Sequence, residues 1–332
     1  MSNIEDLMAR HHVPGLSMAM VSGDAAPTCS VYGLRDCVSE QPVDRFTVFE
    51  AASLSKPVFA FIILQLADKG ILSLDAPLVN LLPNYLTDDP RAATITPRHI
   101  LSHTAGLPNW RSHDYPLKTY FTPGERFSYS GEGYVYLQRA VEHVCGEPLE
   151  AFARRLVFEP LGMTRSSFVW QDRFSLNHAA PHTATGRRFE DGFAGKRVTS
   201  ANAAGSLYTT ADDYARFLQA VLRYPRLEAW LAPRANVQQD QLTSLDSVVP
   251  SPDNDVAWTL GWGVETASLF FFHWGDQKGY KTFTMASRKT AKAMVVFTNG
   301  DGGLSFMSRL VAPIFPGRRP SLFWLGYEAA TD

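Results

Sequence analysis

Ser53 and Lys56 are a pair of residues whose types and spacing could do covalent chemistry. Residues three apart share one face of a helix, so a helix that begins near Ser53 would hold the Lys56 side chain beside its hydroxyl group. A serine hydroxyl becomes a useful nucleophile when an adjacent group takes its proton, and a lysine kept from water can be neutral enough to help. The amino end of a helix also favours developing negative charge. We therefore hypothesise that Ser53 is a catalytic nucleophile.

The same residues have a simpler interpretation, because Ser-x-x-Lys occurs by chance in many proteins. Ser53 would then cap a helix and Lys56 would lie on its surface. An almost wholly apolar segment, residues 58–67, follows the pair and predicts a buried helix that ends at Lys69-Gly70. That helix would shield Lys56 from water. Candidate catalytic partners of Ser53 elsewhere in the chain distinguish between the two interpretations.

Tyr129 is the first candidate partner, and it lies in a glycine-containing loop, residues 127–134, before a predicted helix. A tyrosine could act as a second proton carrier if cationic neighbours favour its phenolate. A core aromatic residue with an exposed hydroxyl group is the more common alternative.

His273, Trp274 and Gly275 end an apolar run and form the second candidate. Glycine at a strand edge lets a substrate lie close to the backbone, and a backbone N–H just beyond it could stabilise an oxyanion. A strand that ends in a turn would have the same pattern. His103 could be a ligand or a base, but a structural histidine bonded to the backbone fits equally well.

Other chemistries find no support in the motifs. Neither His11-His12 nor any other group has the spacing of a zinc site, so we expect no metal. G-x-S-x-G does not occur, which excludes the nucleophile elbow of the α/β-hydrolases. Both glycine-rich nucleotide-binding motifs are also missing, so we expect no cofactor.

Composition describes an ordinary globular protein, with 332 residues, 45% hydrophobic and 19% charged. A net charge of -2 makes no electrostatic case for nucleic acid or an anionic membrane. Cys29, Cys37 and Cys145 cannot all pair within the chain, so a disulfide framework is not expected. The amino terminus shows neither a basic region nor an apolar signal segment, and we expect a cytoplasmic protein.

Periodicity and turn residues predict strands near both ends of the chain and helices between them. The expected strands are residues 16–21, 28–32, 261–266, 269–274, 282–287 and 293–298. The expected helices are residues 4–12, 58–67, 137–144, 149–156 and 306–314, with further starts at Thr96-Pro97 and at residues 209–213. Residues 172–200 and 247–254 are expected to be loops. This order indicates one α/β unit from both termini with a helical insertion.

The ordered motifs resemble the penicillin-recognising serine hydrolases, in the branch of class C β-lactamases, family VIII carboxylesterases and D-amino-acid peptidases. Residues 53–56 match the family's S-x-x-K, and residues 101–107 are similar to its L-L-x-H-T-[SA]-G-L segment. Residues 129–131 fall at its Y-x-N, and residues 273–275 at its K-T-G or H-x-G strand. Further similar segments are residues 160–163, 204–207, 261–263 and 298–300.

The resemblance implies an α/β (α+β) fold of the β-lactamase/transpeptidase type, in which helices flank an antiparallel sheet from both termini. It implies one catalytic domain over residues 1–332, with an α/β part (1–69 and 215–332) and a mostly helical insertion (70–214). Ser53 would attack an acyl carbon while Lys56 and Tyr129 relay its proton. The backbone N–H groups of Ser53 and Asp276 would form the oxyanion hole. His273 would tune Tyr129 or orient the substrate, and His103 would be structural.

Two departures from the family pattern concern the substrate. Gly131 replaces the asparagine of Y-x-N, whose amide contacts an acylamino side chain in the β-lactamases of this branch. Trp274 replaces the middle residue of K-T-G and resembles some family VIII esterases. With the expected cytoplasmic location, these departures favour an esterase, amidase or acyl-transfer activity over a β-lactamase. Five aromatic residues would suit an apolar acyl group, and all of them except Trp274 could equally be core residues: Trp110, Tyr115, Tyr120, Trp258 and Trp274.

We therefore expect a serine hydrolase that cleaves an ester or amide of a small molecule through an acyl-serine, with His273, Trp274, Gly275 and Gly131 in contact with substrate. The alternatives are a β-lactamase or D-amino-acid peptidase, a biosynthetic acyltransferase, and an inactive binding protein on the same scaffold. No nucleic-acid or membrane partner is expected, and the oligomeric state stays open.

Overall fold

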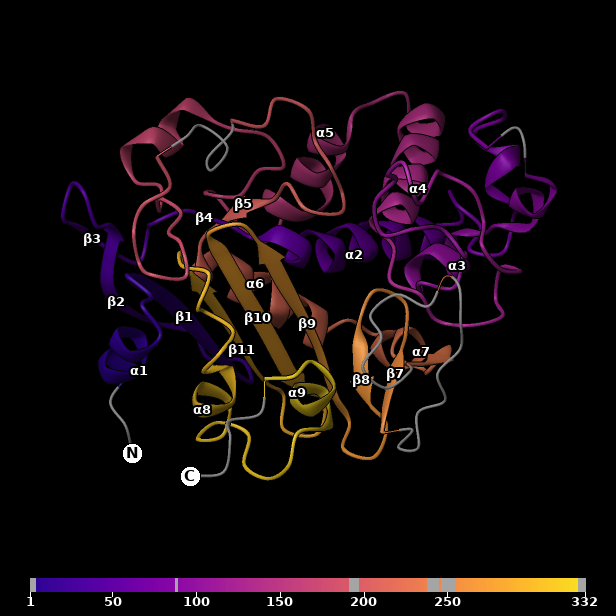
Figure 1. Cartoon of the computed structure of the whole chain (residues 1–332). Coiled ribbons are helices and arrows are strands. Elements are labelled where there is room, and N and C mark those ends of the chain that lie inside the picture. Colours follow the sequence, from indigo (N-terminus) through magenta and orange to yellow (C-terminus); the bar gives the residue numbers. More distant parts are fainter. Residues whose placement is uncertain (1–3, 87–88, 191–196, 238–244, 246–254, 328–332) are drawn as a thin grey trace.

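The fold is organised around an antiparallel sheet, nine-stranded within the residues described. The computed structural model describes residues 4–86, 89–190, 197–237, 245 and 255–327 (Figure 1). The strand order is β3-β2-β1-β11-β10-β9-β8-β7-β6, so the two ends of the chain meet where β1 pairs with β11. The predicted fold, an antiparallel sheet from both termini flanked by helices, is confirmed.

The strands of the sheet are β1 (Gly15–Ser22), β2 (Thr28–Asp36), β3 (Gln41–Pro42), β6 (Ala235–Asn236), β7 (Val256–Trp258), β8 (Gly263–Glu265), β9 (Phe270–Gln277), β10 (Tyr280–Ser287) and β11 (Lys292–Thr298), and β4 (Phe49–Glu50) pairs separately with β5 (Tyr208–Thr209). The α-helices are α1 (Ile4–Arg10), α2 (Ser55–Asp68), α3 (Pro97–Leu101), α4 (Gly131–Cys145), α5 (Leu149–Ala153), α6 (Ala211–Leu222), α7 (Leu227–Trp230), α8 (Met307–Val311) and α9 (Pro320–Trp324). Shorter turns of helix are η1 (Ala52–Leu54), η2 (Leu78–Asn80), η3 (Pro90–Thr94), η4 (Arg154–Phe158) and η5 (Asp172–Leu176).

Each face of the sheet is covered by its own apolar core, because successive side chains of a strand point to opposite faces. On β11, Val295 and Phe297 join the core that contains the apolar residues of α2 and α6. Met294 and Val296 join the other core, with those of α8 and α9. Figure 1 shows α8 and α9 in front of the long strands and α6 behind them. The sheet is therefore the middle layer of the molecule.

Caps explain where the helices near the site begin. Ser130 accepts a hydrogen bond from the N–H of Gly133 at 2.9 Å, so α4 begins at Gly131, before the predicted residue 137. Thr96 caps α3 with Pro97 at its first position, as expected. Thr210 caps α6 through the N–H of Asp213, also as expected. Hydrophobic periodicity locates the middle of α4, whereas its cap fixes its start.

Several short helices and strands were not predicted from the sequence. The strands β3 to β7 are two or three residues long and are too short to show a periodic pattern. α9 follows Arg318-Arg319 and was not expected. In the described part of residues 172–200 the only helix is η5, in line with the expected loop, and residues 247–254 lie outside the described residues. The division at residues 70 and 214 stays a prediction.

α2 is an apolar helix of 14 residues. A helix needs about 20 apolar residues to cross a bilayer. Within the described part of the chain, none is long and apolar enough to do so.

The approach of β9 to the turn η1 leaves no room for a side chain at residue 275. A Cβ atom added to Gly275 would lie 2.3 Å from Thr282 Oγ1 and 2.7 Å from the carbonyl oxygen of Ala51. Real Cβ atoms essentially never make contacts this short. Glycine at this position therefore lets β9 lie directly beside the turn that carries Ser53.

Replacing Gly275 with alanine should push β9 away from η1. Overpacking of a filled interior costs roughly 1–3 kcal/mol, so Gly275→Ala should lower the free energy of unfolding in urea by that amount. Gly205→Ala is the matched control, because a Cβ atom there meets no atom within 4 Å. Equal stability of Gly275→Ala and wild type would contradict this packing.

Candidate active site

Ser53 lies in a strained turn between β4 and α2. Its neighbour Ala52 has a φ of 49°, in the left-handed region that costs a non-glycine residue roughly 1–2 kcal/mol. Side-chain hydroxyl groups hold three carbonyl oxygens of the turn. These are Thr282 Oγ1 to Ala51 at 3.0 Å, Ser55 Oγ to Ala52 at 2.6 Å, and Tyr214 Oη to Leu54 at 3.0 Å. The surrounding fold therefore offsets the strain at Ser53.

Lys56 reaches Ser53 from the first turn of α2. Its Nζ lies 3.1 Å from Ser53 Oγ and donates a hydrogen bond to the carbonyl oxygen of Ala204 at 2.7 Å. The lysine is only 1% exposed, and no carboxylate among the described residues pairs with it. Burial lowers the pKa of Lys56 to about 7. A large fraction of this amine is therefore neutral at neutral pH and able to accept a proton.

Tyr129 lies on the other side of Lys56, directly before the cap of α4. Lys56 Nζ lies 4.8 Å from the centre of the Tyr129 ring. Burial raises the pKa of Tyr129, and the Ser53 hydroxyl counters only part of this rise. The Tyr129 oxygen lies near Ser53 but has no well-formed hydrogen bond to any described group. Tyr129 is therefore a neutral phenol, so the phenolate considered from the sequence is not favoured in the free protein.

His103 holds the segment that carries Tyr129. Its ring stacks on the Tyr129 ring with centroids 4.2 Å apart, and its Nδ1 accepts a hydrogen bond from the N–H of Ser130 at 3.0 Å. Burial, aided by Lys56, lowers the pKa of His103 well below its usual value. A neutral, fully buried ring with these contacts can position Tyr129.

Strand β9 forms the wall opposite Tyr129. Trp274 faces the Tyr129 ring at a centroid distance of 5.5 Å, and Asp276 follows Gly275 at the edge of the cavity. His273 lies beside Tyr129, with ring centroids 6.2 Å apart, but it is fully buried, and its Nδ1 donates to the carbonyl oxygen of Trp274 at 2.8 Å. Burial, with a contribution from Lys56, lowers the pKa of His273 to about 3. A direct contact between His273 and substrate would therefore require movement.

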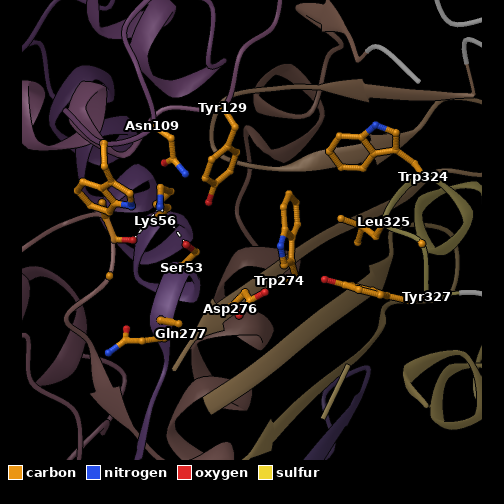
Figure 2. A pocket seen from close by; sticks show the side chains of 15 residues that line it. Ser53, Lys56, Asn109, Tyr129, Trp274, Asp276, Gln277, Trp324, Leu325 and Tyr327 are labelled. Carbon is orange, nitrogen blue, oxygen red and sulfur yellow. Dashed lines mark hydrogen bonds between the residues drawn. The ribbon is translucent and has the colours of Figure 1, made fainter. Parts of the chain in front are cut away.

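These walls line a cavity of about 650 Å³, and Figure 2 shows Ser53, Lys56 and Tyr129 close together in it. Its described lining consists of Ala52, Ser53, Lys56, Asn109, Trp110, Tyr129, Ala204, Gly205, Trp274, Asp276, Gln277, Trp324, Leu325, Gly326 and Tyr327. Of the site residues predicted from the sequence, the structure brings Ser53, Lys56, Tyr129, Trp274 and Asp276 together here. His273, Gly275 and Gly131 do not line it.

The aromatic residues considered from the sequence fall into different surroundings. Trp110 and Trp274 line the cavity. Trp258 is fully buried, contacts the rings of Tyr129 and His273, and belongs to the core. Tyr115 is 40% exposed and, like Tyr120, lies outside the lining.

Sequence reasoning missed the residues that enter the cavity from other loops. Asn109 comes from the loop before α4, and Trp324 and Tyr327 come from α9 and the turn that follows it. A signal that could have indicated Asn109 is its position between Pro108 and Trp110, directly after the family-like segment of residues 101–107. Nothing in the local pattern marks the end of the chain as a wall of this cavity.

Glu50 is a buried carboxyl group behind the cavity wall. Gln277 Nε2 donates a hydrogen bond to Glu50 Oε2, while Oε1 has no partner among the described residues. Burial raises the pKa of Glu50 to about 7. Glu50 thus fixes the side chain of Gln277 in the cavity and can titrate in the same pH range as Lys56.

Asp36, Cys37 and His182 are the described group with ligand atoms close enough for a metal, all within 4.8 Å of one another. Two of the three ligand groups are already engaged, because Nε2 of His182 accepts from the N–H of Cys37 and Asp36 pairs with Arg188. A metal would have to displace these contacts.

Comparisons with known proteins agree with this architecture. Among solved structures, one titled a class C beta-lactamase superposes with a TM-score of 0.76 at 18% identity, covering 95% of each chain. D-amino acid amidase from Ochrobactrum anthropi SV3 superposes with a TM-score of 0.70 at 22% identity, covering 89% of each chain. At these identities the likeness concerns the fold alone.

Curated relatives match over part of their length. Penicillin-binding protein 4* of Bacillus subtilis is 32% identical over 192 residues, which are 52% of this chain and 41% of that protein. Esterase EstB of Burkholderia gladioli is 30% identical over 250 residues, 58% of this chain and 62% of that protein. This chain therefore spans less than two thirds of the length of these relatives. The model of the Beta-lactamase family matches residues 2–312, nearly the whole chain, and the protein belongs to that family.

Proposed function

We propose that the protein is a serine hydrolase that cleaves an ester or amide through an acyl-serine intermediate, with an ester as the preferred substrate. The observation that carries the proposal is the 3.1 Å approach of the buried Lys56 amine to Ser53 Oγ. A neutral amine at this distance can take the serine proton as the hydroxyl attacks a carbonyl carbon. Membership in the Beta-lactamase family and the similarity to an esterase support the same chemistry.

The proton then has a defined route. As the Ser53 Oγ–carbon bond forms, Lys56 takes the hydroxyl proton, and the Tyr129 ring stabilises the resulting ammonium from 4.8 Å. When the bond to the leaving group breaks, Tyr129 gives its proton to the leaving oxygen or nitrogen. The proton on Lys56 then restores the phenol. Water attacks the acyl-serine in the second half of the reaction, with the same groups acting in reverse.

The oxyanion would be held by the backbone N–H groups of Ser53 and Asp276. The close packing of Gly275 against Ala51 supports this assignment, because it brings the end of β9 to the turn that carries Ser53. Two N–H groups directed at a developing negative charge are typically worth more in the transition state than in the ground state. The assignment of Ser53 and Asp276 to the oxyanion hole rests on this position of β9 beside the turn.

Charge in the cavity supports an uncharged ester over a β-lactam or a peptide with a free carboxylate. Lys56 is the only cation in the described lining, and its pKa of about 7 leaves it partly neutral. Asp276 adds a carboxylate at the edge of the cavity, paired with Lys281 at 2.8 Å. A carboxylate on the substrate would find no dedicated counterion among the described lining residues, because the nearby Lys281 is already paired with Asp276 and Asp301.

Mass spectrometry of the intact protein tests the nucleophile. Exposure to a panel of activated esters, amides and β-lactams should add one acyl mass, mapped to Ser53, and esters should react fastest. Ser53→Ala should acquire no acyl group and lose all turnover, while Ser22→Ala, at an exposed serine on β1 outside the cavity lining, should acylate like wild type. Acylation of Ser53→Ala at the wild-type rate would refute the nucleophile, and reaction with β-lactams alone would refute the esterase.

The pH dependence of turnover tests Lys56 as the base. A base works in its unprotonated form, so kcat/KM for an ester should rise with pH through about 7 and then level off. Glu50 also has a pKa of about 7, and Glu50→Gln serves as the control that should keep the same rise. If the rise disappears in Glu50→Gln, it reports the titration of Glu50 and not of Lys56. A flat profile of kcat/KM across this pH range would exclude Lys56 as the base.

Leaving groups of different basicity test Tyr129 as the proton donor. For an alkyl ester, Tyr129→Phe should lower the acylation rate by roughly 10²–10⁴, because a poor leaving group needs its proton. For the p-nitrophenyl ester of the same acid the loss should be much smaller, since nitrophenolate leaves without one. An equal loss for both esters would show that Tyr129 does not deliver this proton.

A further inference from the structure

Asn109 lines the cavity from the loop before α4, and the reaction described above does not use it. Its main-chain carbonyl accepts hydrogen bonds from the N–H groups of Gly131 and Glu132, both at 3.0 Å. Its side-chain Oδ1 accepts from the same N–H of Gly131, also at 3.0 Å. The first turn of α4 therefore holds both the backbone and the side chain of Asn109.

These contacts fix the direction of the carboxamide. The backbone N–H of Gly131 is a donor, so the atom facing it must be the oxygen, and the two N–H donors of Nδ2 face away from α4. Figure 2 shows this nitrogen turned into the cavity, toward Tyr129. No hydrogen-bond acceptor for it is present among the described residues. The cavity thus contains an oriented donor group that has no partner in the described part of the chain.

The loop that carries Asn109 and Trp110 packs directly against Gly131 and leaves no space for a side chain there. A Cβ atom at Gly131 would lie 2.8 Å from the Trp110 ring and 3.0 Å from the carbonyl oxygen of Asn109. A side chain at position 131 would therefore displace Trp110. The sequence suggested that Gly131 leaves the substrate without an amide contact, whereas the fold provides an amide from residue 109.

We propose that Asn109 is a specificity-determining residue that donates a hydrogen bond to a carbonyl oxygen in the acyl part of the substrate. The preferred acyl group would carry this second carbonyl a few atoms from the scissile one, as in an acylamino or keto acid. Trp110, 49% exposed beside Asn109, offers an apolar surface for the rest of the acyl chain. The inference rests on the proposed hydrolysis at Ser53.

Three p-nitrophenyl esters with acyl chains of equal length separate the contacts. Pentanoate has no second carbonyl, levulinate has a ketone in the chain, and N-acetylglycinate has a carbonyl at the same place plus an N–H. The enzymatic kcat/KM of each ester is divided by its rate constant for hydroxide-catalysed hydrolysis, which corrects for differences in chemical reactivity between the esters. A net hydrogen bond of the usual strength predicts that wild type favours levulinate over pentanoate by roughly tenfold in kcat/KM. N-acetylglycinate should be favoured in the same way.

Two substitutions remove the donor differently. Asn109→Asp keeps an oxygen for the N–H of Gly131, and so holds the loop in place, but presents no N–H to the substrate. Asn109→Leu removes both contacts at similar volume. Both should lose the preference for levulinate. Asn236→Leu is the matched control, because Asn236 is exposed on β6 and outside the cavity lining, and it should keep the preference.

The outcomes separate this inference from the proposed function. Equal use of pentanoate and levulinate by wild type would overturn the role of Asn109, as would a preference that survives in Asn109→Asp and Asn109→Leu. Thermal unfolding of each variant checks that its fold is intact. Failure of every ester to acylate Ser53 would instead overturn the proposed hydrolysis, and the role of Asn109 with it.

Discussion

The burial of the Lys56 amine is the constraint on which the rest of the site depends. Moving a charged ammonium out of water is costly unless a carboxylate accompanies it, and no described carboxylate does. The neutral amine is therefore favoured, with one hydrogen bond to the Ala204 carbonyl and one contact to Ser53. The apolar helix α2 behind the lysine maintains this dry environment. The same burial that lowers the stability of the charged form creates a base that can work at neutral pH.

Under the proposed mechanism, the cavity divides into a reacting centre and walls that come from distant parts of the chain. Ser53 and Lys56 lie on a turn and helix start whose carbonyl oxygens are held by hydroxyl groups of β10, α2 and α6. Asn109, Gln277 and Trp324 come from three other segments. Under the proposed mechanism, substitutions in the walls would change the acyl group that fits without disturbing the proton transfers. This separation is consistent with a family whose relatives include proteins named as an esterase and as a penicillin-binding protein.

The sequence predicted the fold class and the long elements well, since β9, β10, β11 and α2 are apolar runs bounded by clear turn residues. The proximity of Ser53 and Lys56 was also predictable, because helical spacing alone places them on one face. The residues that tertiary contacts bring into the cavity were not predictable from the sequence. Asn109 lines the cavity next to Gly131, which leaves space for Trp110, and the buried His273 ring lies beside Tyr129 and bonds the carbonyl oxygen of Trp274. Neither orientation has a local pattern in the chain.

A direct titration of the Lys56 side chain tests the central claim, which is that this amine is neutral enough to act as a base. NMR of protein with isotope-labelled lysine follows the signal of the side chain with pH, and Lys56→Arg assigns it by loss of one resonance. The account predicts a titration midpoint at about 7. A midpoint near 10.4, the ordinary value for lysine, would contradict it, because the protonated amine could not accept the proton of Ser53.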